Sequence, residues 1–172
     1  MIQHTRFTFC PKCGKRAVKT FMKNAMLCDS CGFVYFHNCA AAVAGIVETA
    51  KGIILTVRKK GPKKGRLDLP GGFIDYNESL EGALKREIKE ELNIGISTMN
   101  YFGSFPNVYR YKNVIYFTVD AIFVCRAKNL SSLRPNEEIA GVCFAKPGDI
   151  DFSRIGFPSI RSALKRYAAA YL

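Results

Sequence analysis

Short runs of hydrophobic residues alternate with polar turns through the middle of the chain, which is typical of β-strands. Two apolar runs within residues 40–57, AAAVAGIV and GIILTV, surround the turn-forming segment ETAKG and predict two strands. The segment LDLPGGF, residues 67–73, predicts a short strand that is interrupted at its Pro-Gly-Gly. Residues 99–127 are rich in aromatic and β-branched side chains and predict two or three strands, with a turn near residues 112–113. Residues 137–144 predict one further strand.

Two segments have helical spacing instead. The first begins after Asn77 or Ser79, either of which is a suitable N-cap, and runs for about 15 residues. The second is SIRSALKRYAAAYL, and its apolar residues form one stripe: Ile160, Ala163, Leu164, Tyr167 and Tyr171. Strands interleaved with two helices predict an α/β (α+β) domain with a mixed sheet.

The composition is that of an ordinary globular protein with a strong positive charge. Hydrophobic residues make up 48% of the 172 residues, and no apolar run approaches the roughly 20 residues that span a bilayer. The segment MIQHTRFTFC lacks the apolar core of a secretory signal, so we expect a cytoplasmic protein without a membrane segment. The net charge of +12 suits phosphate-bearing ligands, either nucleotides or nucleic acid. The basic cluster at residues 58–66 is most simply interpreted as a solvated loop.

Four of the seven cysteines form two CxxC pairs: Cys10, Cys13, Cys28 and Cys31. A glycine follows each pair and permits the positive φ that a tight metal-binding turn requires. Four thiolates complete a tetrahedral zinc shell with no position open for a catalytic water, so the spacing predicts structural Zn²⁺. The alternative is a redox dithiol or two disulfides. A zinc ion would replace the core that about 30 residues cannot build, and we expect a zinc ribbon over residues 1–37.

Six of the 14 acidic residues lie within residues 71–94, although the rest of the chain is basic. On the predicted helix, Glu87 and Glu91 continue the line of the leucines in the preceding turns, so they belong to the packed face. Glu90 lies beside them. Three carboxylates on one edge repel one another unless cations neutralise them. Oxygen ligands of this kind suit Mg²⁺ or Mn²⁺.

The alternative for these acids is a solvated helix on which they pair with basic residues one turn away. Arg86 is placed to pair with Glu90, and an exposed pair of this kind contributes only about 0.3–0.5 kcal/mol. That interpretation accounts for Glu90, but it does not explain why Glu87 and Glu91 lie on the leucine line.

The spacing of these residues resembles the Nudix box, G-x5-E-x7-R-E-U-x-E-E-x-G-U, in which U is aliphatic. The matching positions are Gly72, Glu78, Arg86, Glu87, Ile88, Glu90, Glu91 and Ile94. The one departure is Asn93 in place of glycine, and asparagine is the residue that best replaces glycine in a left-handed helix cap. By this resemblance, residues 38–172 are identified as a Nudix domain with its α/β/α sandwich.

The resemblance implies hydrolysis of a nucleoside diphosphate that is linked to another moiety. In the family the reaction uses divalent cations, here Mg²⁺ or Mn²⁺. The implied metal ligands are Glu87, Glu90, Glu91 and the carbonyl of Gly71. Gly72, Glu78 and Arg86 are expected to support the loop–helix–loop of the box.

The general base is not determined by the box alone. A metal lowers the pKa of its bound water, and a carboxylate then takes the proton. Some family members use a box glutamate, which here means Glu87 or Glu91, and others use a glutamate from a later loop. Glu137 and Glu138 are the candidates from such a loop, and we favour Glu137.

A zinc ribbon followed by a Nudix box resembles the NADH pyrophosphatase branch, which cleaves dinucleotides into two mononucleotides. That branch carries S-Q-P-W-P-F-P-x-S after its box, whereas this chain has GSFPNVY there and no tryptophan. NADH or NAD, ADP-ribose and similar compounds are therefore all candidate substrates. Four aromatic residues are candidates to stack on a base or to pack in the core: Phe105, Tyr109, Tyr111 and Tyr116. A homodimer is a further expectation from this resemblance.

Two other functions are compatible with the sequence. A zinc ribbon with a basic surface suits a regulator that binds nucleotides or nucleic acid, although the complete set of box carboxylates favours an enzyme. The second is hydrolysis at an RNA 5′ end, which would use both the ribbon and the box.

Overall fold

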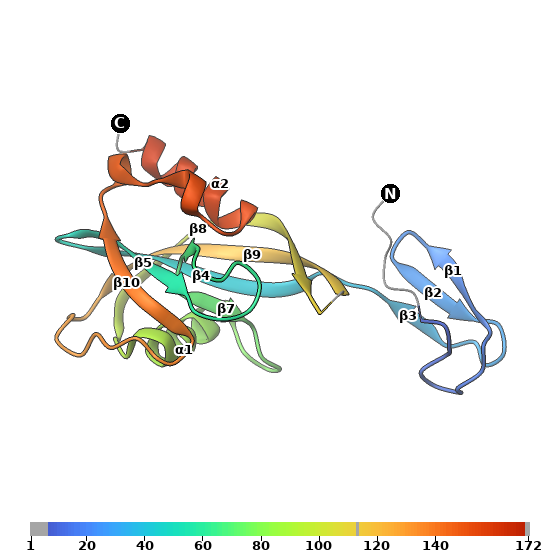
Figure 1. Cartoon of the computed structure of the whole chain (residues 1–172). Coiled ribbons are helices and arrows are strands. Elements are labelled where there is room, and N and C mark those ends of the chain that lie inside the picture. Colours follow the sequence, from blue (N-terminus) through green and yellow to red (C-terminus); the bar gives the residue numbers. More distant parts are fainter. Residues whose placement is uncertain (1–6, 113, 171–172) are drawn as a thin grey trace.

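The computed structural model describes residues 7–112 and 114–170, and its strands form two separate sheets (Figure 1). The smaller sheet contains β1 (Val18–Met22), β2 (Ala25–Cys28) and β3 (Val34–Phe36). The larger contains β4 (Ala40–Thr49), β5 (Gly52–Arg58), β6 (Leu67–Asp68), β7 (Gly71–Phe73), β8 (Ile96–Tyr111), β9 (Val114–Ala127) and β10 (Ile139–Ala145). The helices are α1 (Leu80–Leu92) and α2 (Pro158–Ala169), with short 3₁₀ turns at Pro147–Asp149 and Phe152–Arg154. Within the described residues, no helix combines the length and apolarity needed to cross a membrane.

The three strands of the smaller sheet run antiparallel in the order β1-β2-β3. Figure 1 shows this sheet at one end of the molecule, joined to the larger sheet by the chain between β3 and β4. Several of its large apolar side chains are exposed, as expected where a short segment cannot close a hydrophobic core: Phe7, Phe9, Phe21, Met22 and Phe36.

The larger sheet is mixed, as the sequence predicts, with the strand order β10-β5-β4-β9-β8. β4 and β9 run parallel and the other pairs run antiparallel. The aromatic stretch forms two long strands, β8 and β9; Lys112 precedes the turn between them, and Asn113 lies outside the described residues. β4 pairs with β5 only near Thr49 and with β7 over residues 42–44, so β4 and β5 diverge. A cleft opens where they separate.

The two helices cover opposite faces of this sheet (Figure 1), so the domain is the expected α/β/α sandwich. The α1 face is a core of Val43, Val47, Ile54, Ala83, Leu84, Ile88, Leu92 and Phe123. The α2 face is a core of Ala44, Ile46, Leu55, Ile122, Ile160, Ala163, Leu164 and Tyr167. Successive residues of β4 alternate between these cores, since strand side chains point alternately to opposite faces. The predicted apolar stripe of α2 is confirmed apart from Tyr171, which lies outside the described residues.

Helix α1 begins and ends with the caps that its sequence provides. Ser79 is the N-cap, and its Oγ accepts a hydrogen bond from the Gly82 N–H at 3.1 Å. Asn77, the other candidate, adopts a left-handed conformation in the preceding turn. At the C-terminus Asn93 has φ 55°, and its N–H donates to the Lys89 carbonyl at 2.9 Å. The helix has 13 residues rather than about 15, and asparagine does replace glycine in its left-handed cap.

Candidate active site and metal centres

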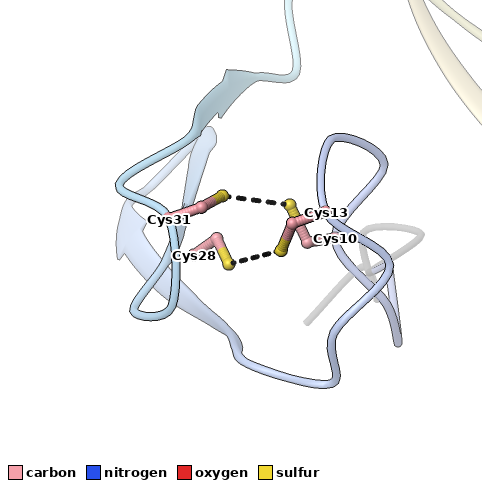
Figure 2. A group of neighbouring side chains, drawn as sticks. All are labelled: Cys10, Cys13, Cys28 and Cys31. Atoms are coloured by element: carbon pink, nitrogen blue, oxygen red, sulfur yellow. Dashed lines mark hydrogen bonds between the residues drawn. The ribbon is translucent and has the colours of Figure 1, made fainter.

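The four paired cysteines meet between two turns of the smaller sheet (Figure 2). Their sulfur atoms all lie within 4.8 Å of one another, and the Cys10–Cys31 and Cys13–Cys28 Sγ distances are both 3.8 Å. Sulfurs at the corners of a tetrahedron, about 2.3 Å from a central zinc ion, lie about 3.8 Å apart. The thiols are not joined as disulfides. The cluster is therefore consistent with a small zinc ribbon.

Two similar turns present these sulfurs. The N–H groups of Gly14 and Gly32 each donate to the carbonyl of the first cysteine of the pair, at 2.9 Å, and both glycines have φ 71°. Burial raises the pKa of the Cys10 thiol, but hydrogen bonds from the backbone of Cys13 and Lys12 outweigh it and lower the value to about 7. The first turn thus favours the Cys10 thiolate, which is the form that binds metal. At Cys31 a backbone hydrogen bond from Phe33 is outweighed by burial and by hydrogen bonds with the other three thiols, which raise its pKa to about 11.

The second site is the cleft where β4 and β5 diverge, with a volume of about 330 Å³. It is bordered by β4, the end of β5, β6, β7, α1, β8, β9, the turn before β10 and the start of α2. Six carboxylates line it: Asp68, Asp75, Glu87, Glu91, Asp120 and Glu138. Arg58 is the one cationic side chain among the described residues that line it. A protein with a net charge of +12 thus contains an acidic cleft, which suits bound cations.

Two of the three expected metal ligands from α1 face the cleft. Glu87 and Glu91 line it, and the Gly71 N–H donates to Glu91 Oε2 at 3.0 Å. The Glu90 side chain is 56% exposed, does not line the cleft, and pairs with Arg86 at 3.2 Å. Both interpretations of the helix therefore hold in part, because Glu90 forms the surface pair while Glu87 and Glu91 lie in the cleft.

Burial disfavours the ionised form of the Glu87 and Glu91 carboxylates when no cation is present. It raises the pKa of Glu91 to about 8, against the hydrogen bond from Gly71, and the nearby Glu87 charge raises it further. Burial also raises the pKa of Glu87, although the hydrogen bond from Arg86 opposes the change. A cation in the cleft would favour the ionised form of both groups.

Arg86 joins the helix to the loop before it. Its Nε and Nη2 donate to the two oxygens of Glu78, both at 2.9 Å, and Nη1 donates to Glu87 at 2.9 Å. Nη2 also donates to the Phe73 carbonyl at 3.1 Å. The hydrogen bonds from Arg86 lower the pKa of Glu78. This fork restricts the Glu87 carboxylate to one orientation, which fits the supporting role that the box implies for Glu78 and Arg86.

The two glycines at the start of the box leave room for atoms of the cleft. Gly71 has φ 147°, and a Cβ there would overlap the backbone of Val43 and Ala44 on β4. A Cβ on Gly72 would overlap the carboxylate of Glu87. Any other residue at position 71 would displace β4, and any other residue at position 72 would displace Glu87. The close packing therefore requires glycine at both positions.

The later loop places Glu138 in the cleft wall and leaves Glu137 outside the lining residues. The N–H groups of Arg134 and Asn136 donate to the Leu92 and Glu91 carbonyls, both at 2.9 Å, and so fix the loop to the end of α1. The position of the two side chains shifts the candidate base from Glu137, favoured from the sequence, to Glu138. Both glutamates lie in the turn that precedes β10, and sequence alone could not show which of the two reaches the cleft.

Asn93 contributes to the same attachment with two side-chain contacts that a glycine could not make. Its Oδ1 accepts from the Lys89 ammonium at 2.7 Å, and its Nδ2 donates to the Ser132 carbonyl at 3.1 Å. The Ser132 hydroxyl donates to the Asn93 carbonyl at 2.9 Å. The departure from the box therefore ties α1 to the loop that carries Glu138.

Arg58 and Asp68 are cleft residues that the sequence analysis did not identify. Arg58 Nη1 donates to Asp68 Oδ2 at 2.9 Å, and the guanidinium lies 5.1 Å from the centre of the Phe157 ring. Burial raises the pKa of Asp68 to about 6, although Arg58 opposes the change. The basic cluster was interpreted as a solvated loop, which is wrong for Arg58, its first residue. The available signal was a carboxylate inside the apolar segment LDLP.

Asp120 gave a similar signal, since it interrupts an apolar strand in VDAIFVC. It is buried, and its two oxygens accept from the hydroxyls of Thr118 at 2.7 Å and Ser159 at 2.5 Å. Asn107, on β8, lines the cleft beside Thr118. These residues form the polar wall opposite the box.

The four aromatic candidates divide between the cleft, the core and the surface. Tyr109 lines the cleft, and Phe105 packs against the core under α2. Tyr111 borders a smaller adjoining pocket, which also contains Lys60 from the basic loop, and Tyr116 is exposed. Only Tyr109 of the four is therefore placed to contact a ligand in the cleft.

Comparison with known proteins gives one family. The NUDIX domain family model matches residues 38–166. Over 114 residues the chain is 30% identical to the NAD-capped RNA hydrolase NudC of Haemophilus influenzae, a match that covers 65% of this chain and 43% of that protein. Over 61 residues it is 48% identical to the ADP-ribose pyrophosphatase of Methanocaldococcus jannaschii, which is 36% of each protein. The matches therefore span less than half the length of these curated relatives.

The fold match extends over more of the chain. A NUDIX hydrolase from Nitrosomonas europaea superimposes with a TM-score of 0.73 and 27% identity, over 94% of this chain and 90% of that one. The match includes residues on both sides of position 38, where the family model begins.

Proposed function

The chain belongs to the Nudix family, and we propose that it is a divalent-metal-dependent pyrophosphohydrolase. Its substrate would be a nucleoside diphosphate derivative, and the products a mononucleotide and a second phosphorylated compound. The observation that carries the proposal is the placement of Glu87, Glu91 and Glu138 around one cleft that Arg58 also enters. Carboxylates that share one cleft are stabilised by cations, and the same cations neutralise a pyrophosphate.

The donor set of the cleft fits Mg²⁺ or Mn²⁺, because it offers only oxygen ligands. Glu87 and Glu91 would hold the metal with the carbonyl of Gly71, and Glu90 would reach it from the rim of the cleft. Burial raises the pKa of Glu87 and Glu91, as expected for groups whose charge is balanced only when a cation is bound. When bound, the metal supplies charge neutralisation and a water of lowered pKa.

The residues of the chain would perform the remaining tasks. Glu138, across the cleft from α1, would accept the proton of the attacking water. Arg58 would contact a phosphate oxygen while its pair with Asp68 keeps the guanidinium in place. The fork of Arg86 would hold Glu87 in its ligating orientation.

We infer that the substrate contains adenosine diphosphate. The names of the two curated relatives refer to NAD and to ADP-ribose, and both compounds contain this group. NADH or NAD and ADP-ribose are accordingly the first candidates. Hydrolysis at an NAD-bearing RNA 5′ end is the second candidate, since one relative is named for that reaction.

We propose further that the four clustered cysteines bind structural Zn²⁺, and that the chain divides into a zinc ribbon at 1–37 and a Nudix domain at 38–172. The regular sulfur spacing supports the metal, and the two separate sheets support the division. Homodimer formation, nucleic-acid binding and a cytoplasmic location stay predictions from the sequence.

The test is a product screen with purified protein and Mg²⁺. The panel would contain NADH, NAD, ADP-ribose, nucleoside diphosphate sugars, nucleoside triphosphates and RNA with an NAD 5′ end. Glu91→Gln is expected to lower turnover by about 10³-fold or more while the melting curve shows a folded protein. Lys85→Gln, on the far side of the same helix, is the control and is expected to leave turnover unchanged.

Two results would reject the proposed function. One is full activity in both Glu87→Gln and Glu91→Gln, and the other is no turnover of any compound on the panel. In the second case, binding of RNA or DNA that weakens steeply with salt would favour the regulator.

A further inference from the structure

The end of the cleft formed by β8 and β9 contains a buried amide that the proposed chemistry does not use. Asn107 is 8% exposed and lines the cleft, yet its Oδ1 has no hydrogen-bond partner among the described residues. A buried carbonyl oxygen without a donor destabilises the folded protein. An unpaired oxygen in a cleft wall therefore points to a ligand that supplies the donor.

The neighbours of Asn107 do not supply it. Thr118 lies opposite Asn107 in the β8–β9 ladder, and its hydroxyl hydrogen is donated to Asp120. The Ser159 hydroxyl is donated to the other Asp120 oxygen. Both hydroxyl hydrogens are thus already donated to Asp120. The two hydroxyl groups beside Asn107 therefore have no hydrogen left for its Oδ1.

Aromatic rings border the same end of the cleft. Tyr109 is two residues after Asn107 on β8 and so faces the same side of the sheet. Phe157 stacks on Tyr109 with the ring centres 5.7 Å apart, and Phe73 meets Tyr109 edge-on at 5.6 Å. All three rings line the cleft. Exposed parts of such rings bind the faces of planar bases.

We propose that Asn107 determines base specificity by recognising the amino-bearing edge of adenine. An asparagine amide pairs with adenine through one acceptor and one donor, and rotation about χ2 lets it turn Oδ1 toward a ligand. On the edge formed by position 6 and N7, the 6-amino group donates to the amide oxygen, whereas the 6-oxo group of hypoxanthine offers only another acceptor. The inference deepens the proposed function, on which it rests for taking the ligand to be an adenosine compound.

The test is equilibrium binding of AMP and IMP to the whole chain by calorimetry, with Mg²⁺ present. The two nucleotides have the same phosphate and ribose and differ in the substituent at position 6 and in the proton that hypoxanthine carries at N1. The wild-type protein is expected to bind AMP at least about tenfold more tightly than IMP. Asn107→Leu, of similar volume, is expected to weaken AMP binding about tenfold and to change IMP binding by less than about twofold. Asn100→Leu, at an exposed position of the same strand, should change neither.

A second variant covers the case in which leucine prevents folding. Asn107→Asp keeps the size and the acceptor oxygens, so it is expected to retain the preference for AMP. Equal wild-type affinity for the two nucleotides, no binding of either, or a preference that survives in Asn107→Leu rejects the proposal. Because this assay measures binding, a protein that prefers AMP but hydrolyses nothing would reject the proposed function and support the base site.

Discussion

The cysteine cluster and the acidic cleft are both candidate metal sites, and they are built in opposite ways. The cluster takes four equivalent sulfurs from two short turns that lie within residues 10–31, and these sulfurs fill a tetrahedral shell. The cleft takes unlike groups from eight helices and strands, leaves its carboxylates open to a ligand, and adds an arginine. A closed sulfur site suits a structural ion, whereas an open oxygen site suits an ion that meets a substrate.

The comparison also separates two sources of stability. Tight turns hold the sulfurs, but the sheet around them has little core of its own, so the bound metal would hold the ribbon together. The carboxylates of the cleft instead lie on an apolar core that is complete without an ion. Removing the metal should therefore unfold the first region and inactivate the second.

The largest expected effect comes from breaking the sulfur site. Cys28→Ser is expected to abolish stoichiometric zinc, as measured by metal analysis, and to expose the ribbon to proteolysis, because structural zinc contributes about 10 kcal/mol or more. Turnover of small nucleotides should stay within about threefold, since no described residue of the ribbon lines the cleft. Cys39→Ser, an exposed cysteine outside the cluster, is the matched control. Loss of turnover from an intact Nudix domain would show that the two regions are coupled.

A smaller effect, confined to the cleft, distinguishes the two adjacent glutamates. Glu138→Gln is expected to lower kcat by about 10²–10⁴-fold, because the amide cannot accept the proton of the attacking water. Glu137→Gln should change kcat by less than about twofold, since that side chain does not line the cleft. Steady-state rates of the two variants, measured across pH, test this prediction. A larger loss of kcat in Glu137→Gln than in Glu138→Gln would identify Glu137 as the general base.

The smallest effect concerns pH. The folded-state pKa values of Glu91, about 8, and Asp68, about 6, lie above the ordinary carboxyl range, so the folded protein binds these protons more tightly than the unfolded chain. Without divalent ions, these two groups should contribute most to the free energy of unfolding below about pH 4. Their contribution should fall as the pH rises to 8. Between pH 5 and 8 the melting temperature should fall by roughly 10 °C, and Mg²⁺ should restore it most at pH 8.

Glu91→Gln is the control for that titration. The variant carries no ionisable group at this position, so its melting temperature should depend less on pH and respond less to Mg²⁺. A wild-type melting temperature that rises from pH 5 to 8 without metal would contradict the placement of these carboxyls.

The sequence predicted the parts of each site that depend on local spacing. The cysteine pairs, the carboxylates Glu87 and Glu91, and the left-handed cap at Asn93 all follow from residues within a turn or two of one another. The fold class followed in the same way, from runs of period two and of helical period. Both glycines of the box were also identified, although their contacts with β4 and Glu87 were not.

The remaining residues of the cleft could not be predicted because register and topology bring them together. Arg58 and Asp68 are adjacent only because β5 pairs with β6, and Asn107 faces Thr118 only because β8 pairs with β9. A one-residue change of register would reverse the direction of every side chain on these strands, and sequence spacing does not determine register across a long hairpin. Buried carboxylates within apolar runs, such as Asp68 and Asp120, were the one local sign.

The parallel pairing of β4 with β9 also orders events on the ribosome. β4 is synthesised early, but its partner emerges only after the box helix and β8, so the carboxylates leave the exit tunnel before the sheet that positions them can form. Pairing between strands distant in sequence is slow, because a long loop must close before any contact compensates for it. The smaller sheet ends at Phe36, so the proposed zinc ribbon would be able to bind its ion while the rest is still being translated. The nascent chain would therefore carry a finished zinc module ahead of an enzyme half that is still assembling.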